Sequence, residues 1–378
     1  MKKIYYGKAV YDNKEINAVL RVLKNDSLTL IDGKKVKELE KKVSQIFGKK
    51  YGLMVNSGSS ANLLALSSFK FKKGSEIITP NLTFSTTVAP IYQLGLIPHF
   101  IGVEENKFLA DTSHIEKCIN KKTVALMIPN LLGNIADWKK INLIAKKYKL
   151  KIIEDSADTI GYKVNNKNLG KYSDITTNSF YASHIINGAG TGGIVCFNDK
   201  NLYQKAKLLR GWGRSSATFN ESEDATKRFS VKVSGIDYDA KYIFSDLGYN
   251  FLPSEISAAF ALEQIKKLKN NISIRKKNFD YLKNFLNNYK NYFKLPEQNV
   301  GVKTPWLAFP LVIKKNKLFN RKQMQIFFEN NNIQTRTIFT GNILKQPVMK
   351  NRYYKKHPKC DYIADDVMRN GILLGCHQ

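Results

Sequence analysis

The stretch IIEDSAD, residues 152–158, joins an apolar run to a group of carboxylates. The run predicts a buried strand at Leu150–Glu154, and the amphipathic residues 138–148 before it predict a helix. In a parallel α/β sheet the carboxyl ends of the strands face the ligand crevice. Asp155 could therefore meet a ligand there, such as the protonated ring nitrogen of a cofactor. From these residues alone, a helix N-cap at Asp155 or Asp158 is an equally good interpretation.

The same alternation continues on both sides of this stretch. Other apolar runs predict strands at Tyr51–Val55, Glu76–Thr79, Ile97–Val103, Val124–Ile128, Ile175–Phe180 and Gly193–Phe197. Amphipathic segments predict helices at Val36–Phe47, Ser60–Phe69, Thr86–Leu94, Asp111–Ile119 and Trp138–Tyr148. The spacing suits strand–helix–strand crossovers, and strands that are apolar on both faces are typical of a covered parallel sheet. We therefore expect an α/β fold with a mostly parallel seven-stranded sheet between helices.

The pattern changes after the last predicted strand. Ser215–Lys241 is polar and charged without a clear period, which predicts a long surface excursion. Pro253–Asp280 predicts a long helix, and the remainder mixes strand and helix. We expect a large domain at residues 1–252 and a smaller α+β domain at residues 253–378. The chain ends directly after an apolar run, so we expect either a short protein or a missing C-terminal part.

The composition excludes several protein classes. Of the 378 residues 43% are hydrophobic and 24% are charged, as in an ordinary globular protein. No run of about 18 apolar residues predicts a membrane span, and the start, MKKIYYG, lacks the apolar core of a signal peptide. The cysteines lack metal-ligand spacing, so we expect no metal and reduced thiols in a cytoplasmic protein. They are Cys118, Cys196, Cys360 and Cys376.

The charge balance is strongly basic. There are 61 Lys and Arg residues against 31 Asp and Glu residues, a formal net charge of +30. Such a charge suits nucleic acid, an anionic membrane or an anionic substrate. The lysines, however, occur as pairs along the whole chain, and no RNA-binding signature accompanies them. We expect solvated basic faces, no nucleic-acid or membrane partner, and a field that attracts a nucleotide-linked substrate.

Two further motifs carry chemistry. NSGSSAN, residues 56–62, follows a predicted strand and opens a helix, where exposed N–H groups suit a phosphate; a plain serine N-cap is the alternative. SFYASHIINGAGTGG, residues 179–193, runs from a strand through His184 into a glycine-rich turn that lets the backbone approach a ligand. A lone histidine is usually structural, but His184 lies at the mouth of the same predicted sheet as the other motifs.

Together these motifs resemble the DegT-type sugar aminotransferase family of fold type I pyridoxal-phosphate enzymes, which act on nucleotide-linked keto-sugars. The resemblance runs nearly end to end, from residues 25–33 to residues 369–371. It includes PNLTF at residues 80–84, GLIP at residues 95–98 and LGYNF at residues 247–251. The resemblance implies the fold type I architecture, with a large cofactor-binding domain and a smaller C-terminal domain.

His184 stands where the aminotransferases of this family have the lysine that binds the cofactor covalently. Because histidine forms no stable imine, the resemblance implies non-covalent pyridoxal 5'-phosphate or pyridoxamine 5'-phosphate. The histidine members of the family are 3-dehydratases of nucleotide-linked 4-keto-6-deoxyhexoses. The resemblance therefore implies loss of the C3 hydroxyl to give a 4-keto-3,6-dideoxyhexose for O-antigen or other polysaccharide synthesis, with His184 as the catalytic base.

The dehydratase branch has two arms. The arm that acts on CDP-sugars holds an iron–sulfur cluster on cysteines after a Trp-Gly-Arg segment. Here GWGR, residues 211–214, is followed by no cysteine up to Lys241, so we expect no cluster. The resemblance implies the other arm, the GDP-4-keto-6-deoxy-D-mannose 3-dehydratases, which regenerate pyridoxamine phosphate from L-glutamate. Two positions depart from the pattern: Thr191 replaces an acidic residue, and Ile185 replaces a second histidine.

The resemblance also implies roles for the cofactor-binding residues. Asp155 would pair with the pyridine nitrogen and keep the ring an electron sink. Gly58, Ser59 and Ser179 would hold the phosphate. Asn250 would reach the phosphate of the neighbouring subunit, which implies a homodimer with shared active sites.

Four further side chains are expected near the reacting groups. Phe84 would stack on the cofactor ring and Ser183 would hydrogen-bond near it. Arg336 would clamp a carboxylate or phosphate, and Arg214 would contact the substrate. The structural alternatives are a core aromatic for Phe84, a strand-end hydroxyl for Ser183 and a surface arginine for Arg336. An aminotransferase acting on a 4-keto sugar, or a binding protein that kept the fold, are the alternatives for the whole chain.

Overall fold

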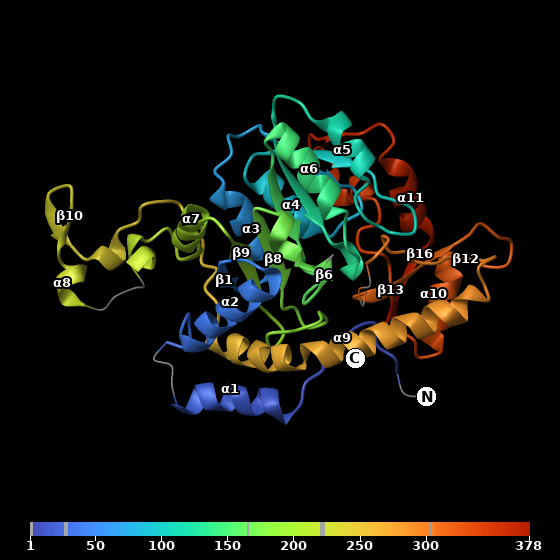
Figure 1. The fold of residues 1–378 in the computed structure, drawn as a ribbon, viewed down its shortest axis with the longest axis horizontal. Helices are drawn as coiled ribbons and strands as arrows, with labels where there is room; N and C mark the ends of the chain where they lie inside the picture. The colour runs from blue at the N-terminus through green and yellow to red at the C-terminus, as the bar shows by residue number, and fades with distance from the viewer. Residues whose placement is uncertain (1–2, 26–28, 165, 220–223, 303, 305) are drawn as a thin grey trace.

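The protein is described by a computed structural model, which covers residues 3–25, 29–164, 166–219, 224–302, 304 and 306–378. Parts of two sequence segments discussed above, residues 26–28 and 220–223, lie outside the described residues. Figure 1 shows a central sheet between helices, a second small sheet at one end and a projecting arm at the other.

The central sheet has the strand order β1-β9-β8-β5-β4-β2-β3-β15. Its strands are β1 (Tyr51–Val55), β2 (Glu76–Pro80), β3 (Ile97–Ile101), β4 (Thr123–Pro129), β5 (Lys151–Asp155), β8 (Ile175–Ser179), β9 (Gly193–Phe197) and β15 (Lys355–Lys356). The neighbours are parallel, except that β9 runs antiparallel to both β1 and β8. All seven predicted strands are present, and β15 adds a short eighth strand from the C-terminal region.

Helices cover both faces of this sheet, as the apolar strands predicted. One layer contains α2 (Lys34–Phe47), α5 (Thr112–Cys118), α6 (Trp138–Tyr148) and the first half of α9 (Glu255–Asn287); the other contains α3 (Gly58–Ser68), α4 (Ser85–Gln93) and α7 (Lys200–Arg210). In β5, Ile152 packs into the first layer and Ile153 into the second, because successive side chains of a strand point to opposite faces. The fold class is therefore confirmed as a helix–sheet–helix sandwich.

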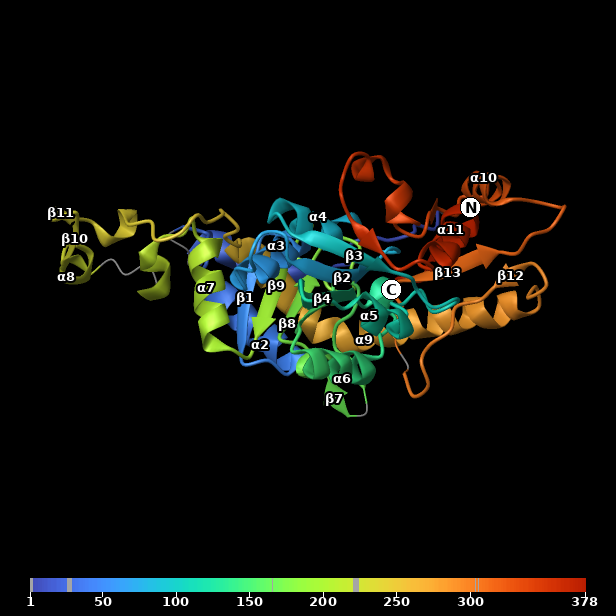
Figure 2. The same ribbon diagram turned by 90° about the horizontal axis from the view of Figure 1, so that it is seen from above.

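The small sheet has the order β12-β13-β16-β14 and is antiparallel throughout. It consists of β12 (Phe293–Lys294), β13 (Ala308–Ile313), β14 (Thr335–Arg336) and β16 (Gly371–Gly375), with α10 (Arg321–Asn330) and α11 (Asp361–Asn370) beside it (Figure 2). The domain boundary at residues 252/253 stays a prediction. The first half of α9 belongs to the core of the large sheet, and β15 pairs with β3.

Helix α9 connects the two parts of the molecule and is longer than predicted. Ser254 caps it by accepting a hydrogen bond from the N–H of Ile256 at 3.1 Å. The carboxylate of Glu255 accepts from the N–H groups of Gly33, Lys35 and Val36, so it caps α2 from a neighbouring helix. Helix α1 (Asn13–Asn25), which the sequence analysis did not predict, lies along α9 (Figure 1).

The predicted excursion projects away from the body in both views (Figures 1 and 2). It contains α8 (Ala225–Arg228) and the hairpin of β10 (Val231–Val233) and β11 (Ile236–Tyr238). A second small hairpin, β6 (Lys163–Val164) with β7 (Lys167–Asn168), follows β5. Within the described part of the chain, no helix has both the length and the apolar character that a bilayer crossing requires.

Candidate active site

A cavity of about 890 Å³ opens at the carboxyl ends of β4, β5 and β8. Its walls come from the large sheet, the N-terminal segment and the small sheet. The predicted site residues that line it are Gly58, Ser59, Phe84, Asp155, Ser179, Ser183, His184 and Arg336. Parallel strands that end at one edge bring these distant segments together, as the topology predicted. No lysine is among the described residues that line the cavity.

Asp155 is the last residue of β5 and is only 6% exposed. Its Oδ2 accepts hydrogen bonds from Asn62 Nδ2 and Thr87 Oγ1, both at 2.8 Å, and its Oδ1 accepts from the N–H of Ala157 at 3.1 Å. Thr177 Oγ1 donates to Asn62 Oδ1 at 2.6 Å and so orients the amide. The residues after Asp155 form a turn, so it does not cap a helix.

The electrostatics of Asp155 fit a cationic ligand. Burial raises the pKa of its carboxyl group, and within the described residues no ion pair compensates its charge. Its three partners are neutral donors, and the carboxylate also lines the cavity. A buried carboxylate in this setting is stabilised by a positively charged N–H group. The protonated pyridine nitrogen of the expected cofactor supplies such a group.

The N-terminus of α3 fits the phosphate of the same cofactor. Ser57 caps the helix through its Oγ, which accepts from the N–H of Ser60 at 3.0 Å, and the first turn leaves other N–H groups without intrahelical partners. Gly58 packs closely on Ser179, since a Cβ at Gly58 would lie 2.6 Å from the Ser179 Cβ. The two predicted phosphate motifs therefore meet at one edge of the cavity.

His184 lies in the loop between β8 and β9, and its side chain is 15% exposed. Burial lowers the pKa of its imidazole to about 4. Its Nδ1 is fully buried and has no hydrogen-bond partner within the described residues, and its Nε2 lies 4.0 Å from Asp158 Oδ1. Burial also raises the pKa of Asp158 to about 7. At neutral pH the imidazole is therefore uncharged and able to accept a proton.

The departures from the family pattern have local explanations. Ile185 is 2% exposed and packs in the apolar core of the large sheet, where a histidine would need a polar partner. Thr191 Oγ1 donates to the carbonyl of Asn56 at 2.5 Å and so joins the glycine-rich turn to the phosphate motif. The four cysteines are buried and unpaired. Within the described residues, no group of three or more His, Cys, Asp or Glu side chains is arranged to hold a metal.

Besides Asp158, which the sequence offered only as a possible helix cap, three residues of the site were not predicted as site residues. Tyr6 lines the cavity, its N–H donates to Gln334 Oε1 at 3.0 Å, and the Arg336 guanidinium lies 5.8 Å from its ring. Asn62 and Thr87 hold Asp155. Asn62 belongs to the quoted phosphate motif, which is the one signal that could have found it. Tyr6 and Thr87 carry no signal, because only the folded chain brings them to the site.

Two predicted residues, Asn250 and Arg214, do not line the cavity of their own chain. Asn250 is exposed and pairs through its backbone with Gly211. Arg214 lies among aromatic rings at the base of the arm, 4.3 Å from the ring centre of Trp212 and 5.5 Å from that of Tyr242. Their roles at a shared active site stay predictions.

Phe84 and Ser183 both line the cavity. Phe84 is 51% exposed, and its ring contacts that of Phe339 edge to face at 6.0 Å. The N-terminal segment crosses Ser183 so closely that a Cβ at Gly7 would lie 2.7 Å from the Ser183 Cβ. Phe84 is therefore available to a planar ligand, whereas Ser183 lies partly under the N-terminal segment.

Comparison with known proteins relates the whole chain to one family. The family model described as the DegT/DnrJ/EryC1/StrS aminotransferase family matches residues 10–378. The lipopolysaccharide biosynthesis protein RfbH of Salmonella typhimurium is 35% identical, with 84% of this chain and 75% of that protein covered. The GDP-4-keto-6-deoxy-D-mannose 3-dehydratase of Escherichia coli O55:H7 is 33% identical, with 98% and 94% covered.

A solved structure is similar over nearly the full length. It is described as GDP-4-keto-6-deoxymannose-3-dehydratase with a trapped PLP-glutamate geminal diamine. Its sequence is 30% identical, the TM-score is 0.86, and the match covers 99% of this chain and 96% of that one.

Proposed function

Because the chain belongs to the DegT/DnrJ/EryC1/StrS aminotransferase family, we propose that it is a pyridoxamine-phosphate-dependent 3-dehydratase of a nucleotide-linked 4-keto-6-deoxyhexose. One observation carries the proposal: an uncharged histidine, His184, lines a cavity to which no described lysine contributes. An aminotransferase needs the lysine, whereas a dehydratase with a non-covalent cofactor does not. GDP-4-keto-6-deoxy-D-mannose is the first candidate substrate, because the E. coli relative is named for it.

The residues of this chain that would hold the cofactor lie at three points of the cavity. Gly58, Ser59 and Ser179 would bind the phosphate at the start of α3. Asp155 would accept a hydrogen bond from the ring N–H, and its carboxylate would keep that nitrogen protonated. Phe84 would cover one face of the ring. Pyridoxamine phosphate supplies an amine that condenses with the sugar ketone and a ring that accepts electrons when a neighbouring C–H bond breaks.

His184 would move the proton of the reaction. Its Nε2 would take the proton, because Nδ1 is fully buried. The same nitrogen would then protonate the departing C3 hydroxyl, so that one base serves both steps. Asp158, 4.0 Å from Nε2, would stabilise the imidazolium between the two steps. Arg336 would hold a carboxylate of L-glutamate, the amino donor that restores the cofactor.

The protein would act as a homodimer with shared active sites. Asn250 and Arg214 lie outside the cavity of their own chain, and exposed apolar side chains follow the same arm. These side chains are Phe229, Ile236, Tyr242, Phe244 and Leu247. Mixing inactive His184→Ala and Asn250→Ala chains would restore about a quarter of the activity by statistical pairing, and no recovery would contradict the shared site. The buried thiols suit the reducing cytoplasm, where we expect the protein to act.

The experiment that tests the function uses the purified protein with pyridoxamine phosphate, L-glutamate and a panel of nucleotide-linked 4-keto-6-deoxyhexoses. Mass spectrometry should find a product that has lost one oxygen atom, together with ammonia and 2-oxoglutarate. A product with an amino group in place of the keto oxygen would identify an aminotransferase instead. Failure to convert glutamate with any sugar would favour a binding protein.

A further inference from the structure

The loop that carries His184 is attached to the large sheet at its two ends. The N–H of Gly188 donates to the carbonyl of Phe180 at 2.9 Å, and the N–H of Gly192 donates to the carbonyl of Asn56 at 3.0 Å. Between Phe180 and Gly188, the loop also makes two side-chain hydrogen bonds with α9. The position of His184 therefore depends in part on what α9 presents to the loop.

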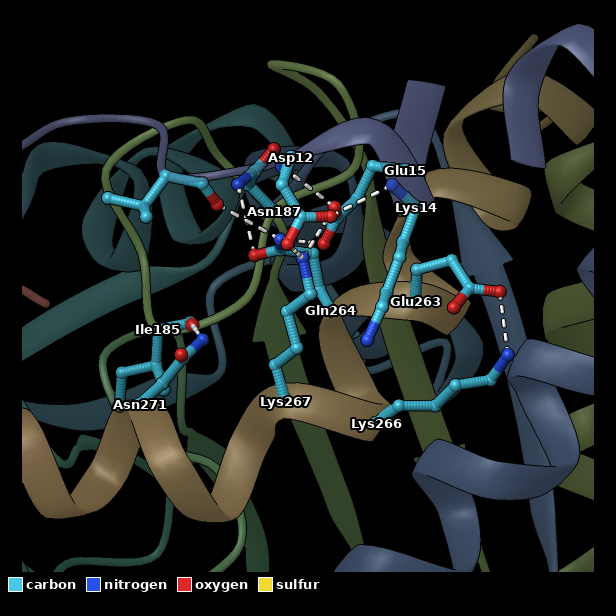
Figure 3. Close-up of polar contacts among 11 residues, drawn as sticks. Asp12, Lys14, Glu15, Ile185, Asn187, Glu263, Gln264, Lys266, Lys267 and Asn271 are labelled. Atoms are coloured by element: carbon cyan, nitrogen blue, oxygen red, sulfur yellow. Dashed lines mark hydrogen bonds and ion pairs between the residues drawn. The ribbon is translucent and has the colours of Figure 1, made fainter. Parts of the chain in front are cut away.

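Two amide side chains of α9 meet the loop (Figure 3). Asn271 Nδ2 donates to the carbonyl of Ile185 at 3.5 Å, which is long for a hydrogen bond. Asn187 Nδ2, from the loop, donates to Gln264 Oε1 at 3.3 Å. Asn187 and Gln264 are 2% and 0% exposed, so neither can exchange its partner for water without opening the structure.

The orientation of the Gln264 amide is set from its other side. Its Nε2 donates to Glu15 Oε1 at 2.7 Å and to the carbonyl of Val10 at 3.0 Å. If the amide turned over, its oxygen would face both a carboxylate and a carbonyl, and its NH₂ group would face the NH₂ group of Asn187. The acceptor Oε1 is therefore held toward the loop.

Glu15 is itself a fully buried carboxylate, with its second oxygen in an ion pair. Lys267 Nζ lies 2.6 Å from Glu15 Oε2 and 2.9 Å from Asp12 Oδ2 (Figure 3). The N–H of Asp12 donates to Glu15 Oε2 at 3.0 Å. These bonds tie the N-terminal segment and α1 to the same turn of α9. The chain of contacts runs from Lys267 through Glu15 and Gln264 to the His184 loop.

We propose that Gln264 and Glu15 are positioning residues, which hold the His184 loop against the cavity through Asn187. The role of His184 as the base rests on the proposed function, but the anchorage of the loop does not. Two apolar side chains in place of Gln264 and Glu15 would fill the same space, and they would avoid the free-energy cost of burying a carboxylate. Hydrogen bonds are directional, so this network holds the loop in one place instead of letting it slide over an apolar surface.

Gln264→Glu tests the proposal, because it keeps the size of the side chain and places a second carboxylate against Glu15. We expect amide hydrogen exchange at residues 185–188 to rise about tenfold and kcat to fall about tenfold, as for coupled residues in one network. The KM for the sugar should stay within about twofold, since Gln264 does not line the cavity. Hydrogen exchange needs no substrate and therefore tests the anchorage even if the proposed reaction is wrong.

The double variant Glu15→Gln with Gln264→Glu exchanges the amide and the carboxylate. It removes the like-charge contact and should return exchange and kcat to within about threefold of the parent. If Gln264→Glu does not fold, Asn187→Ala removes the same bond without a buried charge and should raise loop exchange in the same way. Rescue by the double variant is a result that a merely space-filling role would not produce.

Glu263→Gln is the matched control. Glu263 precedes Gln264 on α9, and its carboxylate accepts a hydrogen bond from exposed Lys266 at 2.6 Å, on the side of the helix away from Ile185 (Figure 3). This change should leave loop exchange and kcat unaltered. The inference is wrong if Gln264→Glu and Asn187→Ala behave like Glu263→Gln, or if the double variant is no better than Gln264→Glu.

Discussion

Asp155 and His184, which we call the two chemical ends of the cavity, are held in different ways. Asp155 ends a central strand and accepts three hydrogen bonds from residues that touch it directly. His184 lies in a loop, and its Nδ1 has no hydrogen-bond partner within the described residues. The loop is held through Asn187, which donates a hydrogen bond to Gln264 of α9. A carboxylate that only has to stay charged can have its hydrogen bonds fixed by neighbouring residues. A base that accepts and donates a proton needs a ring nitrogen that is free of permanent hydrogen bonds. Changes at the two ends should therefore have different effects.

The largest expected effect comes from His184→Lys. Losing the base should lower the rate of dehydration by about 10²- to 10⁴-fold, while the new amine gains the ability to bind the cofactor's aldehyde covalently. The measurements are product formation by mass spectrometry and cofactor absorbance that survives denaturing gel filtration. If the variant dehydrates as well as the parent, His184 is not the base.

Asp155→Asn should affect cofactor binding more than proton transfer. Losing a charge-assisted hydrogen bond to the ring nitrogen should weaken the affinity for pyridoxal phosphate by about 10- to 100-fold, as measured by titration with absorbance detection. Asp158→Asn is the comparison, because Asp158 lines the same cavity beside His184. Equal loss of affinity in the two variants would remove the distinction between the two ends.

The pH dependence of the free energy of unfolding should show a contribution from His184. The pKa of His184 is lowered to about 4 in the folded protein, so between its ordinary value of about 6.5 and pH 4 the unfolded chain binds more protons and stability falls as pH falls. His184→Asn removes this loss, which we expect to amount to about 3 kcal/mol between pH 7 and pH 4. Urea unfolding at both pH values measures it, with His377→Asn as the control. Equal acid sensitivity in His184→Asn and the parent would contradict the burial effect.

The smallest effect should come from Thr87→Val, which deletes one of the three donors to Asp155 and keeps the shape of the side chain. We expect the affinity for pyridoxal phosphate to fall about fivefold, the equivalent of one hydrogen bond of about 1 kcal/mol. Thr86→Val, at the neighbouring position, is the control, since Thr86 lines the cavity without a hydrogen bond to Asp155. An unchanged affinity in Thr87→Val would show that two donors suffice.

The parts of the site that the sequence predicted are those that follow regular strands. Strand periodicity located β5, β8 and the start of α3, and the residues at their ends, Asp155, Ser179 and Gly58, indeed line one cavity. Tyr6, Thr87 and Gln264 escaped prediction, because each belongs to a segment whose own pattern is ordinary. Helix α1 was missed although its sequence is amphipathic, with apolar residues at Ile16, Val19, Leu20 and Leu23. The face that it buries against α9 is a different one and includes Glu15, Ala18 and Val22.

By itself the sequence determined the sheet, its helical layers and the replacement of a lysine by His184, because these depend on local periodicity and on the identity of single residues. Only the tertiary structure decided that the pKa of His184 is lowered, that Asp155 is surrounded by neutral donors, and that Gln264, bonded to Glu15, contacts the His184 loop. A pKa and the direction of a hydrogen bond depend on which distant groups share a water-poor volume. That proximity is created by the packing of α9 and the N-terminal segment, and not by neighbours along the chain.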